Sequence, residues 1–265
     1  LTPRNHQVKI IEEEYMPINF DEECDLIGIS CMTSNAGRAY DIAGEFKKRN
    51  KTVVLGGVHP TILPDEALQH ADSVVVGEAE GVWKDLLEDF QNNRLKQRYH
   101  KSEPDIDQYI PKNFASLKSS RLFNIIPIMT TRGCPYNCDF CCVSNLFGHK
   151  VRHIAIETVV RDIVESKAKN FIFLDDNIVG HPKYAKELFE AIKPLKIRWI
   201  GQASISFAHD TEMMQLAADS GCKALFIGLE SVCEEQLKSF KKSINDIEEL
   251  ESALKKIRKM GILVH

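Results

Sequence analysis

The sequence predicts an α/β protein with two successive domains, each built on a parallel sheet. Short apolar runs rich in β-branched residues alternate with segments whose apolar residues recur at helical spacing. Strands that alternate with helices indicate parallel sheets joined by crossover helices. The stretch 101–124 contains Pro104, Pro111 and several serines without a regular period, which is typical of a linker. The predicted domains are therefore 1–100 and 125–265.

The first domain is predicted from short strands and from helices with one apolar face. Strands are expected at 8–11, 25–31, 52–55 and 73–76, and helices at 36–50, from Pro64 onward and at 80–90. The helix at 36–50 has Ile42 and Phe46 on its apolar face. The strand at 52–55 runs directly into Gly56 and Gly57. Such glycines let a backbone approach a ligand closely, although a tight turn would use them too.

The second domain repeats the strand–helix alternation. Strands are expected at 125–131, 171–174, 197–203, 223–229 and 262–265, and helices at 155–169, from Pro182, after Asp210 and at 245–260. Pro182 suits the first position of a helix, and Asp210 suits an N-cap. Asn245 with Glu248 predicts a capping box. The helix at 155–169 is expected to bury Val164 on its apolar stripe.

Three cysteines follow the strand at 125–131 with the spacing C-x3-C-x2-C, at Cys134, Cys138 and Cys141. Active sites of (β/α) barrels lie at this end of the strands, and thiolates favour zinc, copper(I) or an iron–sulfur cluster. Closed zinc sites and cubane clusters take four protein ligands, so three cysteines leave one position for a small molecule. Cys142 is not expected to be a fourth ligand, because neighbours in an extended chain point opposite ways. A zinc loop or three unrelated core cysteines are the alternatives.

With Phe140 just before its third cysteine, this loop resembles that of the radical S-adenosylmethionine (radical SAM) superfamily. The resemblance implies a partial (β/α) barrel and a 4Fe-4S cluster held by Cys134, Cys138 and Cys141. It implies that S-adenosylmethionine binds the remaining iron and is cleaved to a 5′-deoxyadenosyl radical, with Phe140 near the adenine. It also implies an electron donor such as flavodoxin or ferredoxin.

The segments 55–61 (LGGVHPT) and 75–83 (VVGEAEGVW) resemble the Rossmann-like cobalamin-binding domain that precedes the barrel in one branch of this superfamily. The resemblance implies that cobalamin is bound and that its nucleotide tail and corrin are lined by Ser30, Met32, Gly56 and Gly57. The D-x-H-x-x-G motif, whose histidine ligates cobalt in some cobalamin proteins, is absent. We expect a first domain without its first strand and only the N-terminal part of the barrel, so that both domains are truncated in this chain.

Polar residues follow the strands of the second domain. Carboxylate or amide groups at 175–177 can accept protons from an ammonium group, and the resemblance assigns this position to the methionine moiety. Alternation leaves open whether Asp175 and Asn177 point inward or Asp176 alone, and a helix cap is the alternative. The other candidates are Gln202 and Ser204, for the methionine carboxylate or ribose, and Glu230 and Ser231, for the ribose hydroxyls that the family binds there.

Composition excludes several classes of function. The chain has 34 Lys and Arg against 38 Asp and Glu, a net charge of −4, without a basic run that would indicate nucleic-acid binding. No apolar run reaches the roughly 18 residues of a membrane span. The eight cysteines do not resemble a secreted disulfide framework, which predicts a reducing cytoplasm.

Three functions are compatible with these features. The first is a cobalamin-dependent radical SAM enzyme that methylates an unreactive carbon of a small-molecule or lipid substrate. The second is a radical cyclase or other carbon-skeleton enzyme with a vestigial first domain and no cobalamin. The third is a metal-binding module without catalysis.

Overall fold

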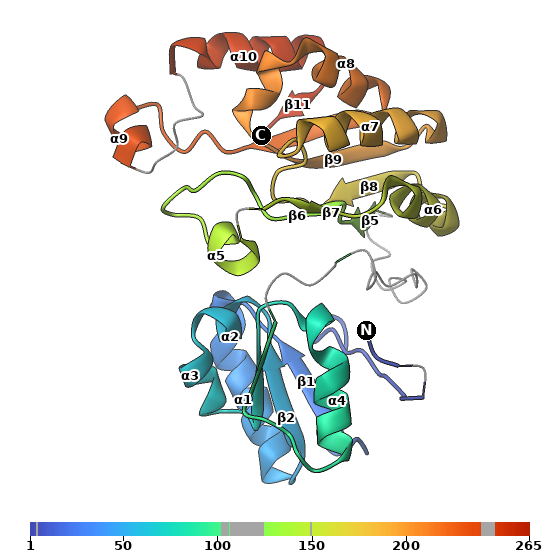
Figure 1. The fold of residues 1–265 in the computed structure, drawn as a ribbon, viewed down its shortest axis with the longest axis vertical. Coiled ribbons are helices and arrows are strands. Elements are labelled where there is room, and N and C mark those ends of the chain that lie inside the picture. The colour runs from blue at the N-terminus through green and yellow to red at the C-terminus, as the bar shows by residue number, and fades with distance from the viewer. Residues whose placement is uncertain (4, 102–105, 107–124, 149, 240–246) are drawn as a thin grey trace. The chain divides into compact units, whose positions relative to one another are not determined.

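The computed structural model describes residues 1–265 except 4, 102–105, 107–124, 149 and 240–246. It divides into two compact units, Leu1–Pro111 and Lys112–His265. Figure 1 shows the elements of each unit along the chain. Most of the predicted linker lies outside the described residues.

The N-terminal unit is built on a parallel sheet whose described strands lie in the order β1-β2-β3-β4. The strands are β1 (Leu26–Ser30), β2 (Thr52–Gly56), β3 (Ser73–Val76) and β4 (Arg98–His100). The helices are α1 (Ala36–Lys48), α2 (Val58–Ile62), α3 (Pro64–Leu68) and α4 (Trp83–Gln91). Short 3-10 turns, η1 (Thr33–Asn35) and η2 (Ala79–Gly81), precede α1 and α4.

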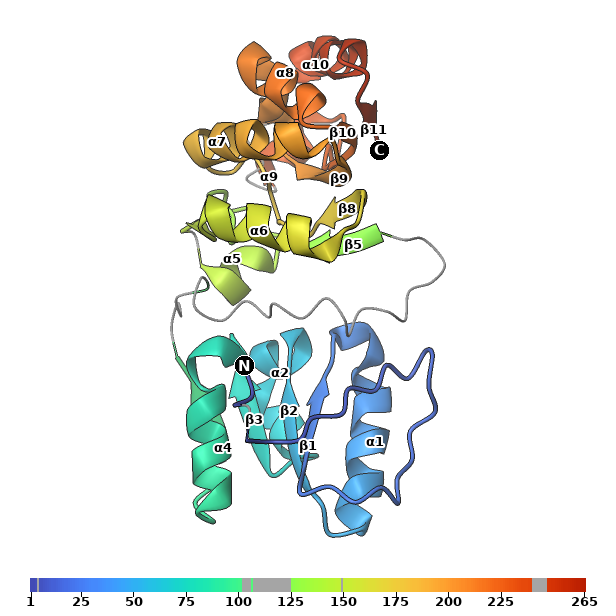
Figure 2. The ribbon, with the colours of Figure 1, turned by 90° about the vertical axis from the view of Figure 1, so that its right-hand side faces the viewer.

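Helices cover both faces of this sheet. One core joins α1 and α3 to the sheet through side chains such as Phe46, Leu55 and Ala67. A second core on the other face joins α4 to the sheet through Val54 and Leu86. Figure 2 shows α1 and α4 on opposite sides of the strands. The parallel α/β sheet with crossover helices that was predicted for this part of the chain is confirmed.

The C-terminal unit has a second parallel sheet, whose described strands follow chain order. They are β5 (Ile125–Ile128), β8 (Asn170–Phe173), β9 (Arg198–Ala203), β10 (Cys222–Ile227) and β11 (Leu263–Val264). A short antiparallel pair, β6 (Thr131–Arg132) with β7 (Arg152–His153), flanks the sheet. The helices are α5 (Val143–Phe147), α6 (Ile156–Ser166), α7 (Pro182–Ile192), α8 (Thr211–Asp219), α9 (Glu234–Ser239) and α10 (Ile247–Lys259). Two 3-10 helices, η4 (Lys193–Leu195) and η5 (Ile205–His209), complete this unit.

Among the described residues, helices pack against one face of this second sheet, and side chains on the other face remain exposed. Trp199 is buried and stacks on Phe189 of α7, with ring centroids 5.2 Å apart. Side chains that alternate with the buried ones remain exposed, among them Leu174 and Phe226, at 53% and 41%. Strands in chain order with helices on one face are the arrangement of a partial (β/α) barrel.

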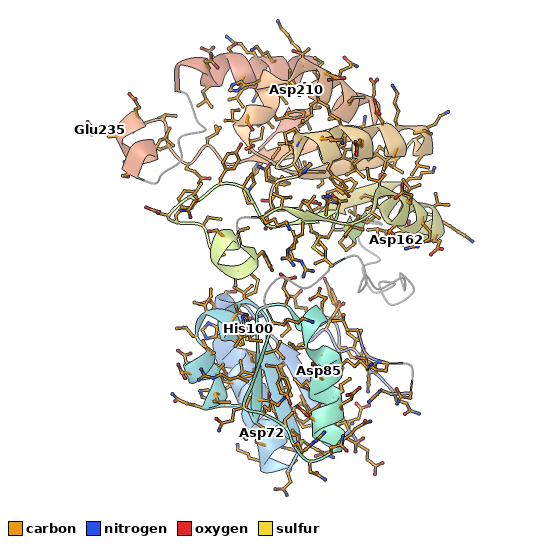
Figure 3. The ribbon with its side chains drawn as sticks, viewed as in Figure 1. Asp72, Asp85, His100, Asp162, Asp210 and Glu235 are labelled. Atoms are coloured by element: carbon orange, nitrogen blue, oxygen red, sulfur yellow. The ribbon has the colours of Figure 1, made fainter. Side chains whose placement is uncertain are left out.

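Most predicted elements are present, and several helix ends form as their residues predict. Pro182 is the first residue of α7. Asp210 caps α8 by accepting a hydrogen bond of 2.9 Å from Met213 N, at the position labelled in Figure 3. Gly261 ends α10 with a positive φ of 76°. The predicted capping box at Asn245 lies outside the described residues.

The strand predicted at 8–11 is wrong. These residues form no strand; Val8 and Ile10 are 60% and 68% exposed, and Lys9 pairs with the Glu22 carboxylate. The apolar residues of this run therefore have no neighbouring strand to pack against. In contrast β4, which ends at His100 (Figure 3), was not predicted, because its single buried side chain, Tyr99, gives no apolar run.

Two further expectations for the C-terminal unit need correction. The strand predicted at 125–131 is interrupted after Ile128, and Thr131 pairs instead with β7. Val164 is 56% exposed, while Asp162 on the same helix is buried. Val164 follows Ile163 by one residue, which in a helix turns it about 100° away from the buried stripe.

Within the described part of the chain, no helix is both long enough and apolar enough to cross a bilayer.

Candidate functional site

The three-cysteine loop begins where β6 ends, at a glycine that the fold requires. Gly133 has φ +96°, and a Cβ there would lie 2.7 Å from the carbonyl oxygen of Lys150. Only glycine fits so close a backbone approach in this conformation. The loop therefore leaves the sheet in a fixed direction immediately before Cys134.

The cysteines of the loop differ in exposure. Cys134, Cys138 and Cys141 are half-buried, whereas Cys142 is exposed at the start of α5. The N–H of Cys141 donates to the carbonyl of Cys138 at 3.0 Å, which closes a turn between these two cysteines. Cys142 is thus turned to solvent while the other three side chains stay with the loop.

Asp175, directly after β8, anchors the segment that leads into this loop. Its side chain is fully buried and accepts hydrogen bonds of 2.6 Å from the hydroxyls of both Thr130 and Thr131. The backbone N–H groups of both threonines also donate to it, that of Thr130 at 3.2 Å. Burial raises the pKa of Asp175, and these donors act in the opposite direction by favouring the carboxylate. The carboxylate therefore faces protein donors.

Asp176 makes the next contact along the same segment. One of its carboxylate oxygens accepts from Gly133 N at 3.3 Å. Burial raises the pKa of Asp176, while that hydrogen bond and the nearby Arg132 guanidinium oppose the rise. Asp176 is half-buried, so its carboxylate can also meet a ligand. Of the two aspartates it fits the predicted ammonium acceptor better than Asp175.

Asn177, the third residue of this run, binds Ser204, which directly follows β9. It is 3% exposed; its Oδ1 accepts from Ser204 N at 3.1 Å, and its Nδ2 donates to Ser204 Oγ at 3.3 Å. Burial raises the pKa of the Cys134 thiol, and the N–H of Tyr136 and the Asn177 amide act in the opposite direction. Residues 175, 176 and 177 thus bind, in order, the threonine pair, Gly133 and Ser204.

The structure brings only some of the remaining predicted residues to this site. Ser204 is joined to it through Asn177. Gln202 lies on the exposed face of β9, and Phe140 is 51% exposed. Ser231 accepts from Cys233 N at 2.9 Å and donates to Gln236 at 2.6 Å, within its own loop. Glu230 is exposed with φ +62°.

Sequence reasoning missed four residues that hold the site together: Thr130, Thr131, Tyr136 and Ser206. The threonine pair stands immediately before Arg132, and two hydroxyls next to a ligand loop are a signal that could have been used. Ser206 and Tyr136 gave no such signal, because their contact joins residues far apart in the sequence.

The donor set fits an iron–sulfur cluster. In the part of the chain that the structure describes, no three His, Cys, Asp or Glu side chains converge closely enough to hold a single metal ion. A 4Fe-4S cubane takes one thiolate per iron. Its cysteine ligands therefore lie farther apart than the ligands of a single metal ion. Three half-buried thiols on one anchored loop provide such ligands.

In the N-terminal unit, the predicted cobalamin residues lie at the carboxyl ends of β1 and β2, where Ser30 pairs with Gly56. Gly57 has φ +96°, and a Cβ there would lie 2.7 Å from Cys31 O and 2.8 Å from Ser30 Oγ. A Cβ on Gly56 would meet only Val75 Cβ, at an ordinary 3.6 Å. Met32 is 58% exposed. The fold itself therefore requires a glycine at 57 but not at 56.

His59, in the segment 55–61, joins the elements around this strand end. It is 4% exposed, with Nε2 2.9 Å from Tyr40 OH and 3.2 Å from Glu66 Oε1, and Nδ1 3.2 Å from Thr33 Oγ1. Burial and the Glu66 carboxylate raise the pKa of Tyr40 to about 12. The buried histidine thus links η1, α1, α2 and α3.

Family models match both units. The model described as Radical SAM superfamily matches residues 128–265, and the model described as B12 binding domain matches residues 6–87.

Curated relatives and solved structures match over most of the chain. It is 36% identical to bacteriochlorophyllide d C-8(2)-methyltransferase of Chlorobaculum tepidum, over 99% of the chain and 62% of that protein. It is 35% identical to the C-12(1)-methyltransferase of the same organism, over 91% of the chain and 55% of that protein. The chain therefore spans less than two thirds of the length of these relatives.

Two solved structures share the fold. One is the radical S-adenosylmethionine methyltransferase TsrM from Kitasatospora setae, with a TM-score of 0.78, 18% identity and coverage of 92% of this chain and 56% of that one. The other is the cobalamin-dependent S-adenosylmethionine radical enzyme OxsB, with a TM-score of 0.79, 19% identity and coverage of 93% and 41%. At these identities the likeness concerns the fold.

Replacing Cys134, Cys138 or Cys141 with Ala is expected to abolish iron binding, because each removes one thiolate ligand. Cys142→Ala and Cys233→Ala are matched controls, since both thiols are exposed. Iron and sulfide per protein after anaerobic reconstitution measure the effect. Loss of iron in Cys142→Ala equal to that in the other three would show that the ligand assignment is wrong.

Asp175→Ala is expected to lower the free energy of unfolding by about 3 kcal/mol, because it leaves buried hydroxyl and N–H donors without an acceptor. Asp219→Ala, which removes a carboxylate paired with Lys193 at the surface, should have a much smaller effect, because solvent screens exposed ion pairs. Urea denaturation of both variants measures the difference. Equal effects would contradict the anchoring role of Asp175.

Proposed function

Because the chain belongs to the radical SAM superfamily, as its cysteine loop predicts, and carries a B12 binding domain, we propose that the protein is a cobalamin-dependent radical methyltransferase. It would methylate an unreactive carbon. The observation that carries the proposal is the three-cysteine loop anchored by Asp175 and Asp176 at the carboxyl ends of a parallel sheet. In parallel α/β sheets and barrels, ligands bind at the carboxyl ends of the strands.

The residues of the C-terminal unit have separate roles in this proposal. Cys134, Cys138 and Cys141 hold the cluster. Asp176 accepts hydrogen bonds from the methionine ammonium group, because its carboxylate is half-buried beside the start of the loop. Gln202, on the exposed face of β9, is the proposed donor to the methionine carboxylate or ribose. Asp175 holds the segment that leads into the loop, and Asn177 joins it to Ser204.

When bound, the cluster, S-adenosylmethionine and cobalamin supply the radical and the methyl group, and the protein supplies position and exclusion of water. In the N-terminal unit, Ser30, Met32 and Gly56 are the proposed contacts of cobalamin. Gly57 and His59 stabilise the backbone conformation at the carboxyl ends of β1 and β2, where these contacts lie.

The substrate class that we propose to test first is a cyclic tetrapyrrole. The two relatives at 36% and 35% identity both methylate a bacteriochlorophyllide. Hopanoid methylases match at 22% and 27% identity, so a polycyclic lipid is the second class. A reducing cytoplasm with a flavodoxin or ferredoxin as electron donor is the proposed setting.

The intact protein, reconstituted anaerobically with iron, sulfide and hydroxocobalamin, tests this function. We expect a four-iron cluster by Mössbauer spectroscopy, cobalamin retained on gel filtration, and 5′-deoxyadenosine after reduction with S-adenosylmethionine. A methyl-labelled bacteriochlorophyllide from labelled S-adenosylmethionine would support the tetrapyrrole substrate. Cluster and deoxyadenosine without cobalamin would favour the radical cyclase alternative. One zinc ion and no deoxyadenosine would overturn the enzymatic proposal.

The glycine pair gives a matched test of cobalamin binding. Gly56→Ala is expected to leave the protein folded, because its Cβ meets only ordinary contacts, and to weaken cobalamin retention by adding a methyl group at the ligand edge. Gly57→Ala is expected to destabilise the N-terminal unit by about 1–3 kcal/mol through backbone strain. Thermal melts and cobalamin absorbance after gel filtration measure both. Full cobalamin retention in Gly56→Ala would exclude Gly56 from the binding edge.

A further inference from the structure

We propose that Thr33 is a further binding residue for cobalamin, and that His59 orients its hydroxyl so that the oxygen accepts a hydrogen bond from an amide side chain of the corrin. The proposal rests on the proposed function, since it assumes that the N-terminal unit binds cobalamin. Thr33 is not among the contacts named above, which are Ser30, Met32 and Gly56.

The turn that leads to Thr33 is fixed at the carboxyl end of β1. The N–H of Cys31 donates to Gly56 O at 3.0 Å, and the N–H of His59 donates to Cys31 O at 3.2 Å. These bonds tie the start of the turn to the segment that follows β2. Thr33 is the first residue of η1 and is exposed. It is therefore held next to the strand ends at which the proposed cobalamin contacts lie.

Tyr40 and Glu66 determine which ring nitrogen of His59 carries the hydrogen. Tyr40 OH donates to Glu66 Oε1 at 3.0 Å. This bond, followed by the one from His59, lowers the pKa of Glu66, so the carboxylate is an acceptor. Nε2 of His59 lies 3.2 Å from the same carboxylate oxygen and 2.9 Å from Tyr40 OH, whose single hydrogen is already used. In the neutral ring the hydrogen is therefore on Nε2.

The other ring nitrogen sets the direction of the Thr33 hydroxyl. Without a hydrogen, Nδ1 of His59 can only accept, and Thr33 Oγ1 lies 3.2 Å from it. The hydroxyl hydrogen of Thr33 is thus directed at the buried ring, which is 4% exposed. The hydroxyl oxygen still has lone pairs for a donor outside the protein. A ligand at this edge therefore meets an acceptor, and not a donor, at Thr33.

The chemistry of cobalamin matches this acceptor. The corrin ring carries primary amide side chains, and an amide nitrogen has two hydrogens to donate. Thr33 can accept such a hydrogen bond without giving up the one that it donates to His59. Because the His59 ring is buried and held through both of its nitrogens, the hydroxyl is oriented before the ligand binds. Such preorganisation lowers the cost of ordering the site on binding.

Three variants of the intact protein test the role of the Thr33 oxygen. Thr33→Val has a similar volume but no hydroxyl, so it should bind hydroxocobalamin about fivefold more weakly, the effect of one net hydrogen bond. Thr33→Ser restores the oxygen and should bind as the parent protein does. Ser34→Ala is the matched control, because it removes a hydroxyl from the next exposed residue of the same turn. Titration followed by cobalamin absorbance gives the dissociation constants, and thermal melts compare the folded states.

Modified ligands separate a binding role of Thr33 from a structural one. Hydrolysis of a single peripheral amide converts cobalamin into a monocarboxylic acid, in which a carboxylate replaces the amide donor. The parent protein should bind one of these derivatives more weakly than cobalamin. In Thr33→Val the same replacement should weaken binding by a factor that is about fivefold smaller, because the acceptor is already absent. A structural effect of the valine would weaken the binding of cobalamin and of every derivative equally.

Other outcomes overturn the inference in distinguishable ways. Equal dissociation constants for Thr33→Val and the parent would overturn it and leave the proposed function intact. The same holds if the parent binds cobalamin and every derivative equally well, or if Thr33→Val loses affinity for all of them by one factor. Weak binding by Thr33→Ser or Ser34→Ala would show that the turn, and not the oxygen, matters. A parent protein that binds no cobalamin would overturn the proposed cobalamin dependence and this inference together.

Discussion

The hydrogen bonds of the buried Asp175 carboxylate are the interaction on which the candidate site depends. A loop that carries metal ligands has few sheet bonds of its own, so something must fix where it leaves the sheet. Asp175 does so by accepting from the hydroxyls and N–H groups of Thr130 and Thr131. Burying a carboxylate is unfavourable unless such donors satisfy it, and removing it would leave those donors unsatisfied in turn. Because the buried Asp175 carboxylate and its donors are unfavourable without each other, Thr130 and Thr131 are held in one conformation.

This anchoring changes the interpretation of the polar run at 175–177. In a strand, consecutive side chains would point to opposite faces, which is why the sequence suggested that only one or two of them reach the site. The run lies just after β8, where the chain leaves the strand. Asp175 and Asp176 bind the segment that leads into the cysteine loop, and Asn177 binds Ser204 after the neighbouring strand. A motif that resembles a ligand-binding position is therefore also the structural support of the cluster loop. Only Asp176, half-buried, has a carboxylate placed for both roles.

The features that were predicted correctly from the sequence are those determined by residues close together in the chain. The buried strands at 52–55 and 73–76 form because their apolar runs suit a sheet covered on both faces, and Asp210 caps its helix because capping needs only the next turn. The spacing of the three cysteines was informative for the same reason. Contacts set by tertiary structure were not predictable: Ser206 meets Tyr136 across 70 residues, and the run at 8–11 lacks a neighbouring strand although its composition suits one.

The N-terminal unit shows how a motif can serve the fold and a ligand at once. The adjacent glycines at 56 and 57 suggest a ligand edge, yet Gly57 is already required by the close approach of Cys31 and by its positive φ. A protein of this fold that had lost cobalamin would still need it. Gly56 has no such requirement, since a methyl group there would make only an ordinary contact with Val75. Of the two glycines, Gly56 is therefore the better indicator of cobalamin binding. The fold does not require a glycine at this position, so a bound ligand can explain its presence.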